Sequence, residues 1–335
     1  NQTMKCFPLP PDLCIWCGQG RKDIQMKVLV TGGAGFIGSH LVRRLQAEQV
    51  DVTVLDNLST GTLEHLPKGT KFIKMDINAP ELDKVFEEGQ FDAVVHLAGQ
   101  IAVGVSMEDP VFDCQQNILG SVHVMEAARR NKVKRIIFSS TAAAYGDVAD
   151  SQLPVKEDEP LQVLSFYGLS KIGVERYLEL YSRSFGLEYV ILRFANVYGE
   201  RQGDSGEGGV ISIFTRRIAE GKDITIFGDG RQTRDFVYAG DIANGIYRAL
   251  KTPYANTIYN LSTQTETSLN TLVEVLSKVA GRKVHPLYGP ARPGDIYRSS
   301  LSNRKAEAGL LWRPETSLEE GLKETYRYFK DMYGK

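Results

Sequence analysis

Two side chains in the segment Tyr167-Gly-Leu-Ser-Lys171 are suited to proton transfer. On a helix, a spacing of four residues places both on one face. A lysine ammonium beside a phenol favours the phenolate and lowers a pKa that is about 10 in water. Such a tyrosine can act as a base toward a hydroxyl group near neutral pH. Thr141 ends the segment Ser139-Ser140-Thr141. Its side chain would donate a second hydrogen bond to the oxygen of that hydroxyl group and position it.

A glycine-rich turn follows the apolar residues 27–30. Residues 31–40 are Thr-Gly-Gly-Ala-Gly-Phe-Ile-Gly-Ser-His, so the pattern is a strand, a turn and the start of a helix. Gly32 would make the tight turn, and Gly35 would let backbone N–H groups approach a pyrophosphate. Gly38 would let the helix pack closely on the strand. The turn therefore predicts a dinucleotide site.

The acidic residue Asp56 indicates which dinucleotide is bound. It ends a second strand pattern over residues 50–55, close to the expected separation of about 20 residues from the glycines. A carboxylate there accepts hydrogen bonds from a ribose 2′,3′-diol and repels a 2′-phosphate, which favours NAD over NADP. An ordinary amphipathic helix would explain Tyr167 and Lys171 alone, and an unrelated turn would explain the glycines alone. Neither explains all of these segments in this order.

From Met26 onward, strand patterns alternate with helical ones. Further strands are expected over residues 71–75, 91–97, 135–138 and 189–193, and helices over 117–131 and 167–184. At least six strands interleaved with helices predict an α/β fold with a doubly wound parallel (Rossmann) sheet, in which ligands bind beyond the carboxyl ends of the strands. Asp76, Ala98 and residues 139–141 fall at such ends.

Composition argues against several kinds of partner. The 335 residues include 40 Lys+Arg and 41 Asp+Glu, a net charge of −1, so neither nucleic acid nor an anionic membrane is expected as a partner. No apolar run approaches the roughly 18 residues of a membrane span. Four cysteines are too few for a disulfide scaffold, so a cytoplasmic location is expected. No metal site is expected from the histidines, and Cys114 is expected to be a buried helix residue.

The first 25 residues do not fit the alternating pattern. They precede Met26, where the first strand begins as it would after an initiator methionine, and they include Cys6, Cys14 and Cys17. The last two form a C-x-x-C motif, but no second ligand pair accompanies it. A secretory signal would need a basic region, an apolar core and a small-residue cleavage site, which this segment does not clearly have. We expect residues 1–25 to be an extension outside the fold.

Residues 26–333 resemble the extended short-chain dehydrogenase/reductase superfamily, and within it the NAD-dependent nucleotide-sugar epimerases and dehydratases. UDP-glucose (UDP-galactose) 4-epimerases of bacterial type are the most similar group. The segments behind this resemblance are TGGAGFIGSH (31–40), DNLSTG (56–61), HLAGQ (96–100), Asn117, SSTAAAYGD (139–147), YGLSK (167–171), LRFANVYG (192–199), FGDGRQTRDF (227–236) and RPGD (292–295).

The resemblance implies a set of residues that bind NAD. Asp76 and Ile77 would flank the adenine, and Lys171 would also bond the nicotinamide ribose. The implied cofactor residues are Gly32, Gly35, Phe36, Ile37, Gly38, Asp56, Asn57, Asp76, Ile77, Leu97, Ala98, Gly99, Gln100, Asn117, Ser139, Tyr167 and Lys171. The implied catalytic residues are Thr141, Tyr167 and Lys171.

The resemblance also implies a UDP-sugar substrate. Asn196, Arg234 and Arg292 would bind the diphosphate, since guanidinium groups can clamp phosphate oxygens. Phe227 could stack on the uracil, although a core position is an equal alternative, and Arg234 could instead form a surface ion pair with Asp235. The implied substrate residues are Ser106, Thr141, Tyr167, Asn196, Val210, Phe227, Arg234, Arg292, Asp295 and Ser299.

Two alanines after Thr141 restrict the reaction. The 4,6-dehydratases of the superfamily have Thr-Asp-Glu at this place, and UDP-glucuronate decarboxylases usually keep the glutamate, whereas this chain has Ala142 and Ala143. Elimination and decarboxylation would therefore lack their proton donor. The remaining reaction is 4-epimerisation of a UDP-hexose through a transient 4-keto sugar. Alternatives are a UDP-glucuronate 4-epimerase, another nucleotide-sugar oxidoreductase, a silent NAD-sensing or RNA-associated protein, or a structural partner protein.

The sugar pocket, the domains and the assembly can also be predicted. Aligned on Gly294-Asp295, Ser299 falls where related epimerases have a residue that walls the hexose pocket, and a small side chain there would admit N-acetylhexosamines. We expect an NAD domain of residues 26–193 and 236–262. A smaller, discontinuous α/β lobe of residues 194–235 and 263–335 would bind the nucleotide sugar. A homodimer would form by packing the helices at 117–131 and 167–184 into a four-helix bundle.

Overall fold

The computed structural model describes residues 25–203, 209–292 and 296–334. In this part of the chain, seven strands form one sheet in the order β11-β6-β5-β4-β1-β2-β3, with every neighbouring pair parallel. The strands are β1 (Lys27–Thr31), β2 (Asp51–Asp56), β3 (Lys71–Lys74), β4 (Ala93–His96), β5 (Arg135–Thr141), β6 (Glu188–Phe194) and β11 (Thr257–Leu261). The predicted doubly wound parallel sheet is confirmed.

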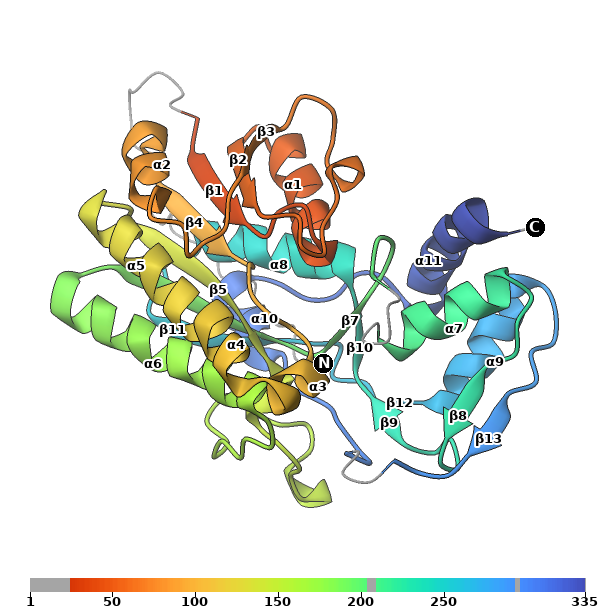
Figure 1. Cartoon of the computed structure of the whole chain (residues 1–335). Helices are drawn as coiled ribbons and strands as arrows, with labels where there is room; N and C mark the ends of the chain where they lie inside the picture. Colours follow the sequence, from red (N-terminus) through yellow and green to blue (C-terminus); the bar gives the residue numbers. More distant parts are fainter. Residues whose placement is uncertain (1–24, 204–208, 293–295, 335) are drawn as a thin grey trace, which may run out of the picture.

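Helices cover both faces of this sheet (Figure 1). Successive side chains of β1 alternate between two cores: Val28 and Val30 belong to one, and Leu29 belongs to the other. The first core contains α1 (Phe36–Ala47) and α8 (Ala239–Lys251). The second contains α2 (Leu82–Gly89), α5 (Gly120–Arg130) and α6 (Phe166–Phe185). Burial on both faces explains why the strands are nearly continuous runs of Val, Ile and Leu.

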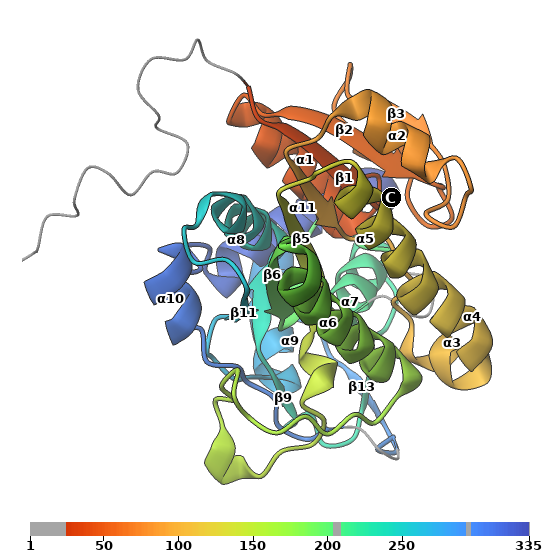
Figure 2. The same cartoon turned by 90° about the vertical axis from the view of Figure 1, so that its left-hand side faces the viewer.

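The helix expected over residues 117–131 begins earlier and is not uniform. Its parts are α4 (Pro110–Cys114), a π turn (Gln115–Leu119) and α5, and the separate short helix α3 (Val103–Glu108) precedes it. The side chain of Asp109 accepts a hydrogen bond from Phe112 N and caps α4. Cys114 is exposed, so the expectation that it is buried is wrong. Figure 2 shows α5 and α6 side by side, with α3 and α4 at the end of this helical layer.

The remaining residues build a smaller lobe from three short strand pairs and three helices around a core of its own. The pairs are β7 (Asn196–Tyr198) with β10 (Phe236–Tyr238), β8 (Thr225–Phe227) with β13 (Leu287–Gly289), and β9 (Thr233–Arg234) with β12 (Thr267–Ser268). The helices are α7 (Val210–Ala219), α9 (Leu269–Ala280) and α11 (Leu318–Tyr333). Figure 1 shows this lobe beside the sheet.

Two segments of the lobe's half of the sequence belong to the sheet layer. β11 pairs with β6 at the sheet edge, and α10 (Arg304–Leu310) packs on β11 and α8. Short 3₁₀ turns cover Leu63–His65, Ala142–Ala144 and Asp150–Gln152. Within the described residues, no helix is both long and apolar enough to span a membrane. The expected extension, except Gln25, lies outside the described residues.

Candidate active site

The glycine turn brings the start of α1 close to the end of β1. Gly32 has a φ of +72°, and a Cβ at Gly38 would lie 2.3 Å from the carbonyl oxygen of Gly32. Only glycine permits the first backbone conformation without strain and the second contact at all. The turn therefore aims the backbone N–H groups of the first turn of α1, at Phe36, Ile37 and Gly38, beyond the sheet edge, where an anion can accept them.

Asp56 lies beside this turn at the carboxyl end of β2. Its carboxylate is buried and accepts hydrogen bonds from Ala34 N at 3.0 Å and Leu58 N at 2.8 Å. At the end of β3, Asp76 accepts a hydrogen bond from Asn57 Nδ2 at 2.8 Å, and Ile77 next to it is buried. The four residues expected around the adenosine are thus brought to one corner of the sheet.

Asn117 fixes the segment that follows β4. Its Oδ1 accepts a hydrogen bond from Gln100 N at 2.9 Å, and its Nδ2 donates to Gln100 O at 3.0 Å. Leu97 N and Ala98 N bond to Thr31, at the end of β1. A Cβ at Gly99 would lie 2.6 Å from Asn117 Oδ1 and 3.8 Å from Lys171 Nζ. The segment Leu97–Gln100 therefore runs between the glycine turn and the lysine.

Tyr167 and Lys171 lie on α6 opposite the end of β5. The Lys171 ammonium donates a hydrogen bond to Ser139 O at 3.1 Å and lies 5.9 Å from the centre of the Tyr167 ring. Thr141 lies close enough to Tyr167 for its side chain to lower the pKa of the tyrosine. Helix α6 is fixed in place by Ser165, which accepts a hydrogen bond from Gly168 N as N-cap. The three expected catalytic residues therefore come together.

Burial changes the proton affinities of this pair. Desolvation raises the pKa of Tyr167 to about 12, while the polar side chain of Thr141 acts in the opposite direction. Desolvation lowers the pKa of Lys171 to about 8. The sequence predicts a lowered tyrosine pKa beside an ammonium, but in the protein by itself desolvation has the larger effect on Tyr167. A further positive charge at the site is needed to favour the phenolate.

His96 has both ring nitrogens occupied. Nδ1 hydrogen-bonds with Thr31 Oγ1 at 2.7 Å and Nε2 with Ser121 Oγ at 2.9 Å. Complete burial and the nearby Lys171 lower its pKa to about 3. The ring therefore stays neutral and cross-links β1, β4 and α5, which fits a structural rather than a catalytic role.

A buried ion pair that the sequence analysis did not single out lies behind the catalytic helix. Arg193 of β6 donates to both carboxylate oxygens of Glu175 on α6, at 2.9 and 2.6 Å. Glu175 also accepts a hydrogen bond from Ser140 Oγ at 2.5 Å. Glu175 is one helical turn beyond Lys171. This spacing of four residues was the only sign in the sequence that Glu175 lies on the same face of the helix as the lysine. The pair joins β5, β6 and α6 directly beneath the site.

The lobe places an aromatic ring beside an arginine, and a second arginine lies on another of its strands. Phe227, at the end of β8, is 37% exposed and is therefore not a core residue. The guanidinium of Arg292 lies 4.2 Å from the centre of this ring. Arg234 belongs to β9, and its neighbour Asp235 is buried and accepts backbone N–H groups of other loops, so these two do not form a surface ion pair. Asp295 lies outside the described residues.

Backbone hydrogen bonds define the position of Ser299. Thr233 N donates to Tyr297 O and Val155 N donates to Ser300 O, each at 2.9 Å. The hydroxyl of Tyr297 donates to the carboxylate of Asp229, with the shorter contact at 3.2 Å. Tyr297 is therefore directed toward the loop after β8. Of the other expected substrate residues, Ser106 is buried on α3, Asn196 is exposed on β7 and Val210 begins α7.

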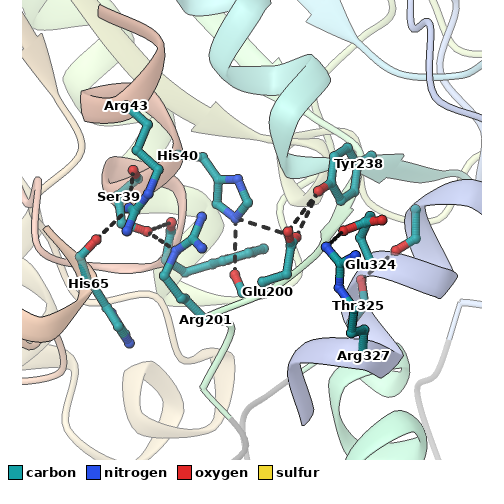
Figure 3. A network of polar contacts seen from close by, with 12 residues as sticks. Ser39, His40, Arg43, His65, Glu200, Arg201, Tyr238, Glu324, Thr325 and Arg327 are labelled. Carbon is teal, nitrogen blue, oxygen red and sulfur yellow. Dashed lines mark hydrogen bonds and ion pairs between the residues drawn. The ribbon is translucent and has the colours of Figure 1, made fainter. Parts of the chain in front are cut away.

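A polar network connects the cofactor side with the lobe (Figure 3). Glu200 lies between His40 of α1 and Tyr238 of β10: its carbonyl oxygen is 3.0 Å from His40 Nε2, and its carboxylate accepts a hydrogen bond from the Tyr238 hydroxyl at 2.8 Å. Arg201 Nε donates to Ser39 Oγ at 2.8 Å. The loop that leaves β7 is thus tied to the first turns of α1.

The sequence of this chain matches a family model over most of the described fold. The model of the NAD dependent epimerase/dehydratase family matches residues 28–262. The chain belongs to this family. Membership accounts for the combination of a dinucleotide turn with a tyrosine–lysine pair. Family membership also accounts for the acidic residue at the end of β2, because this position contacts the dinucleotide in NAD-binding folds of this type.

Solved structures of epimerases have the same fold as this protein. The chain is similar to the UDP-glucose 4-epimerase of Thermotoga maritima with UDP-glucose, with a TM-score of 0.88 and 41% identity over 92% of this chain and 99% of that chain. The chain is also similar to the UDP-glucose 4-epimerase of Thermus thermophilus in complex with NAD, with a TM-score of 0.85 and 40% identity. That similarity covers 91% of this chain and 99% of that chain. For the UDP-N-acetylglucosamine 4-epimerase of Methanobrevibacter ruminantium M1 in complex with UDP-N-acetylmuramic acid, the TM-score is 0.87 and the identity is 35%. The similarity covers 92% of this chain and 99% of that chain.

Proposed function

We propose that this protein interconverts UDP-glucose and UDP-galactose by NAD-dependent epimerisation at C4 of the hexose. The observation behind this is the meeting of Thr141, Tyr167 and Lys171 at the ends of β5 and α6, with Ala142 and Ala143 where an acid would serve other reactions of the family. Relatives with the same fold, which are UDP-glucose 4-epimerases in name, support it.

NAD fits the residues at the carboxyl ends of β1 to β5. The N–H groups of the first turn of α1 suit its pyrophosphate, and Asp56 suits the adenosine ribose. Asp76 and Ile77 would lie at the adenine, and Lys171 at the nicotinamide ribose. When bound, NAD supplies the acceptor and then the donor of a hydride, together with a positive charge at the nicotinamide. That charge favours the phenolate of Tyr167, against the desolvation described above.

Tyr167 performs the proton transfers at the sugar. In its phenolate form it accepts the proton of the 4-hydroxyl group, and it returns a proton when the 4-keto sugar is reduced on its other face. Thr141, which lowers the pKa of the tyrosine, would donate a hydrogen bond to the same sugar oxygen and position it. Lys171, fixed by Ser139 O, keeps its positive charge near the phenolate. The alanines offer no proton to a neighbouring carbon, so water elimination is not assisted.

The lobe holds the nucleotide. Phe227 would stack on the uracil, and Arg234 and Arg292 would bind the diphosphate with Asn196. Asp295 is proposed for the uridine ribose. We divide the chain into an NAD domain of 26–193 and 236–262 and a substrate lobe of 194–235 and 263–335. The pairing of β11 with β6 and the separate core of the lobe support this division, except that β10 pairs with β7 of the lobe and α10 packs on the sheet layer.

We also propose that the protein is a cytoplasmic homodimer. The low number of cysteines fits a reducing compartment. Helices α3, α4 and α6 and the π turn expose large apolar side chains, namely Met107, Val111, Leu119, Leu169 and Leu180 among others. On a monomer these apolar side chains would face water, and packing against the same helices of a second copy would bury them.

The test is conversion of UDP-galactose without added reductant. The purified protein should form UDP-glucose in a coupled assay. Tyr167→Phe preserves ring volume but removes the proton acceptor, so its turnover should fall by about 10²–10⁴ while fold and NAD content are retained. Near-native turnover by this variant would assign the base to another group. Turnover of UDP-glucuronate but not of UDP-galactose would replace the substrate in this proposal.

A further inference from the structure

Asp113 is a buried acid close to the catalytic pair that the mechanism above does not use. It lies on α4 and is 1% exposed. Its Oδ1 accepts hydrogen bonds from Gln100 Nε2 at 2.9 Å and from Asn117 Nδ2 at 3.0 Å. Burying a carboxylate is costly, so a buried acid with only amide partners calls for a compensating charge nearby.

The amide groups around Asp113 connect it to α6. Asn117 Nδ2 also donates to Ser170 Oγ at 3.2 Å, and Ser170 Oγ donates to the carbonyl oxygen of Tyr167 at 3.0 Å. Asn117 and Lys171 both approach Gly99 closely. Asp113 is therefore fixed in space relative to the tyrosine and the lysine, and α4 packs directly against α6.

The π turn over Gln115–Leu119 helps to form this arrangement. It begins two residues after Asp113 and contains Asn117. Both side chains reach Gln100, although this residue belongs to the loop after β4. π turns widen a helix locally and are frequent at functional sites. Here the turn occurs where α4 and α5 face the catalytic helix.

Asp113 acts electrostatically on both catalytic groups. Its negative charge raises the pKa of Lys171, against the larger lowering by burial, and it raises the pKa of Tyr167 further. A negative charge favours the protonated form of each neighbour. In the absence of that charge, both groups would release their protons at lower pH.

No other charge in the described residues has the same effect on this pair. His96 of β4 faces Lys171, but it is neutral because its pKa is lowered to about 3. Residues 139–141 of β5 and the 3₁₀ turn of alanines contribute no ionisable group. On the next turns of α6, Glu175 is paired with Arg193 of β6, and Tyr181 is bonded to Glu126 of α5.

We propose that Asp113 is a positioning residue for proton transfer, whose buried charge favours the ammonium form of Lys171 and shifts the pH range in which Tyr167 accepts a proton. This inference rests on the proposed function, in which Tyr167 is the base. Asp113 touches neither the tyrosine nor the sugar. It acts through its charge and through the amides of Gln100 and Asn117.

The test compares two variants that each remove one acidic charge from α4 or its cap. Asp113→Asn keeps the shape and an acceptor for Gln100 and Asn117. Asp109→Asn is the matched control, because Asp109 is exposed and its Asn can still cap α4. The readout is the pH titration of the Tyr167 phenolate, measured by ultraviolet difference absorbance against Tyr167→Phe in each background, with the protein as purified. The pH profile of UDP-galactose turnover is recorded in parallel.

In Asp113→Asn the phenolate midpoint should fall by about one pH unit, a tenfold change in proton affinity. The acid limb of turnover should move down by the same amount, and Asp109→Asn should match the unchanged protein. A reduced rate with an unmoved midpoint, an upward shift, or an equal shift in Asp109→Asn would overturn the proposal. If Asp113→Asn does not fold, Asp113→Ser tests the same loss of charge.

The two readouts separate this inference from the proposed function. If the unchanged protein converts no UDP-sugar, the proposed function fails, while the phenolate titration still reports on Asp113. If it converts UDP-galactose and the midpoint of Asp113→Asn does not move, only the inference on Asp113 fails.

Discussion

At the scale of single residues, small side chains decide which chemistry the site allows. Ala142 and Ala143 follow Thr141 in a 3₁₀ turn, and Thr141 accepts a hydrogen bond from Ala143 N as the cap of that turn. The backbone that positions the threonine is thus built without an acid. We propose that Ser299 is a second such residue, which leaves space where a larger wall residue would meet the hexose.

The first prediction concerns this space. The protein should interconvert UDP-N-acetylglucosamine and UDP-N-acetylgalactosamine as well as UDP-glucose and UDP-galactose. Ser299→Tyr should abolish only the first activity, because a phenol ring fills the volume of an acetamido group. Turnover of both sugar pairs is measured for each protein.

Tyr297→Phe is the control for this experiment. The Tyr297 hydroxyl bonds to Asp229 rather than reaching the position of Ser299, so the variant should process both sugar pairs. No turnover of N-acetylhexosamines by the unchanged protein would contradict the prediction. Loss of all turnover in Ser299→Tyr would show that the residue supports catalysis as a whole.

At the scale of elements, α1 connects the cofactor turn to the lobe. Its N-terminal turn follows the glycines, and His40 on its next turn contacts Glu200 in the loop after β7 (Figure 3). His40 is 8% exposed, and burial lowers its pKa to about 4 from an ordinary 6.5. A neutral imidazole is therefore part of the contact between the two parts of the molecule.

The resulting prediction is an acid dependence of stability. Because the unfolded chain binds the His40 proton first as the pH falls, the free energy of unfolding should decline from about pH 6.5 until about pH 4. The full decline due to this residue is about 3 kcal/mol. His40→Gln keeps a donor for Glu200 O and should flatten that part of the profile, measured by denaturant unfolding at several pH values.

His285→Gln is the control, since His285 is exposed in the lobe. An unchanged slope in His40→Gln would mean that the imidazole is not held neutral in the folded protein. A strong loss of stability at pH 8 would instead indicate that the amide does not replace the contact to Glu200.

The elements and the chemistry were predictable to different degrees. Strands β1 to β6 are short apolar runs, and each was predicted within a few residues because burial on both faces leaves little choice of side chain. The bounds of β11 and of the short strands in the lobe were not predicted. The tyrosine and lysine were predictable because local spacing on α6 brings them together. Asp113 was not, because its importance depends on the packing of α4 against α6, which no local pattern shows.

Two further features of the structure were not predicted from the sequence, again because they depend on features that local patterns do not show. Periodicity alone did not indicate the π turn, since one extra residue per turn shifts the apolar positions only slightly. Glu175 and Arg193 are far apart in sequence and meet only because β6 lies beside β5 and beneath α6. Charged residues inside a pattern of helix or strand are usually assigned to the surface, and only tertiary structure identifies such a buried pair.

At the scale of the whole molecule, one apolar layer is left open. On α6, Phe166, Leu169, Tyr177 and Leu180 are exposed and follow helical spacing. Helices α3 and α4 and the π turn expose further apolar side chains. Figure 2 shows these helices beside α6. The opposite side of α6 is already packed on the sheet through Val174 and Leu178. A helix that is apolar on both sides requires a second partner.

The prediction for this layer is a dimer in solution. Light scattering after size exclusion should give twice the chain mass at micromolar concentration. Leu180→Glu should give a monomer, because a charge in the apolar contact cannot be solvated. Met332→Glu, which changes an equally exposed residue on α11, is the control and should remain dimeric. A monomeric unchanged protein would contradict the prediction, as would a dimeric Leu180→Glu.

The late position of β11 has a consequence for synthesis of the chain. β6 ends at Phe194, while its outer neighbour β11 begins at Thr257. At about 5–20 residues per second on the ribosome, the segment between them takes on the order of 3–12 seconds to emerge. During that interval β6 is an open sheet edge with unpaired backbone groups, which invites pairing with other nascent chains. Premature termination within residues 195–256 therefore yields aggregation-prone fragments rather than a usable cofactor domain.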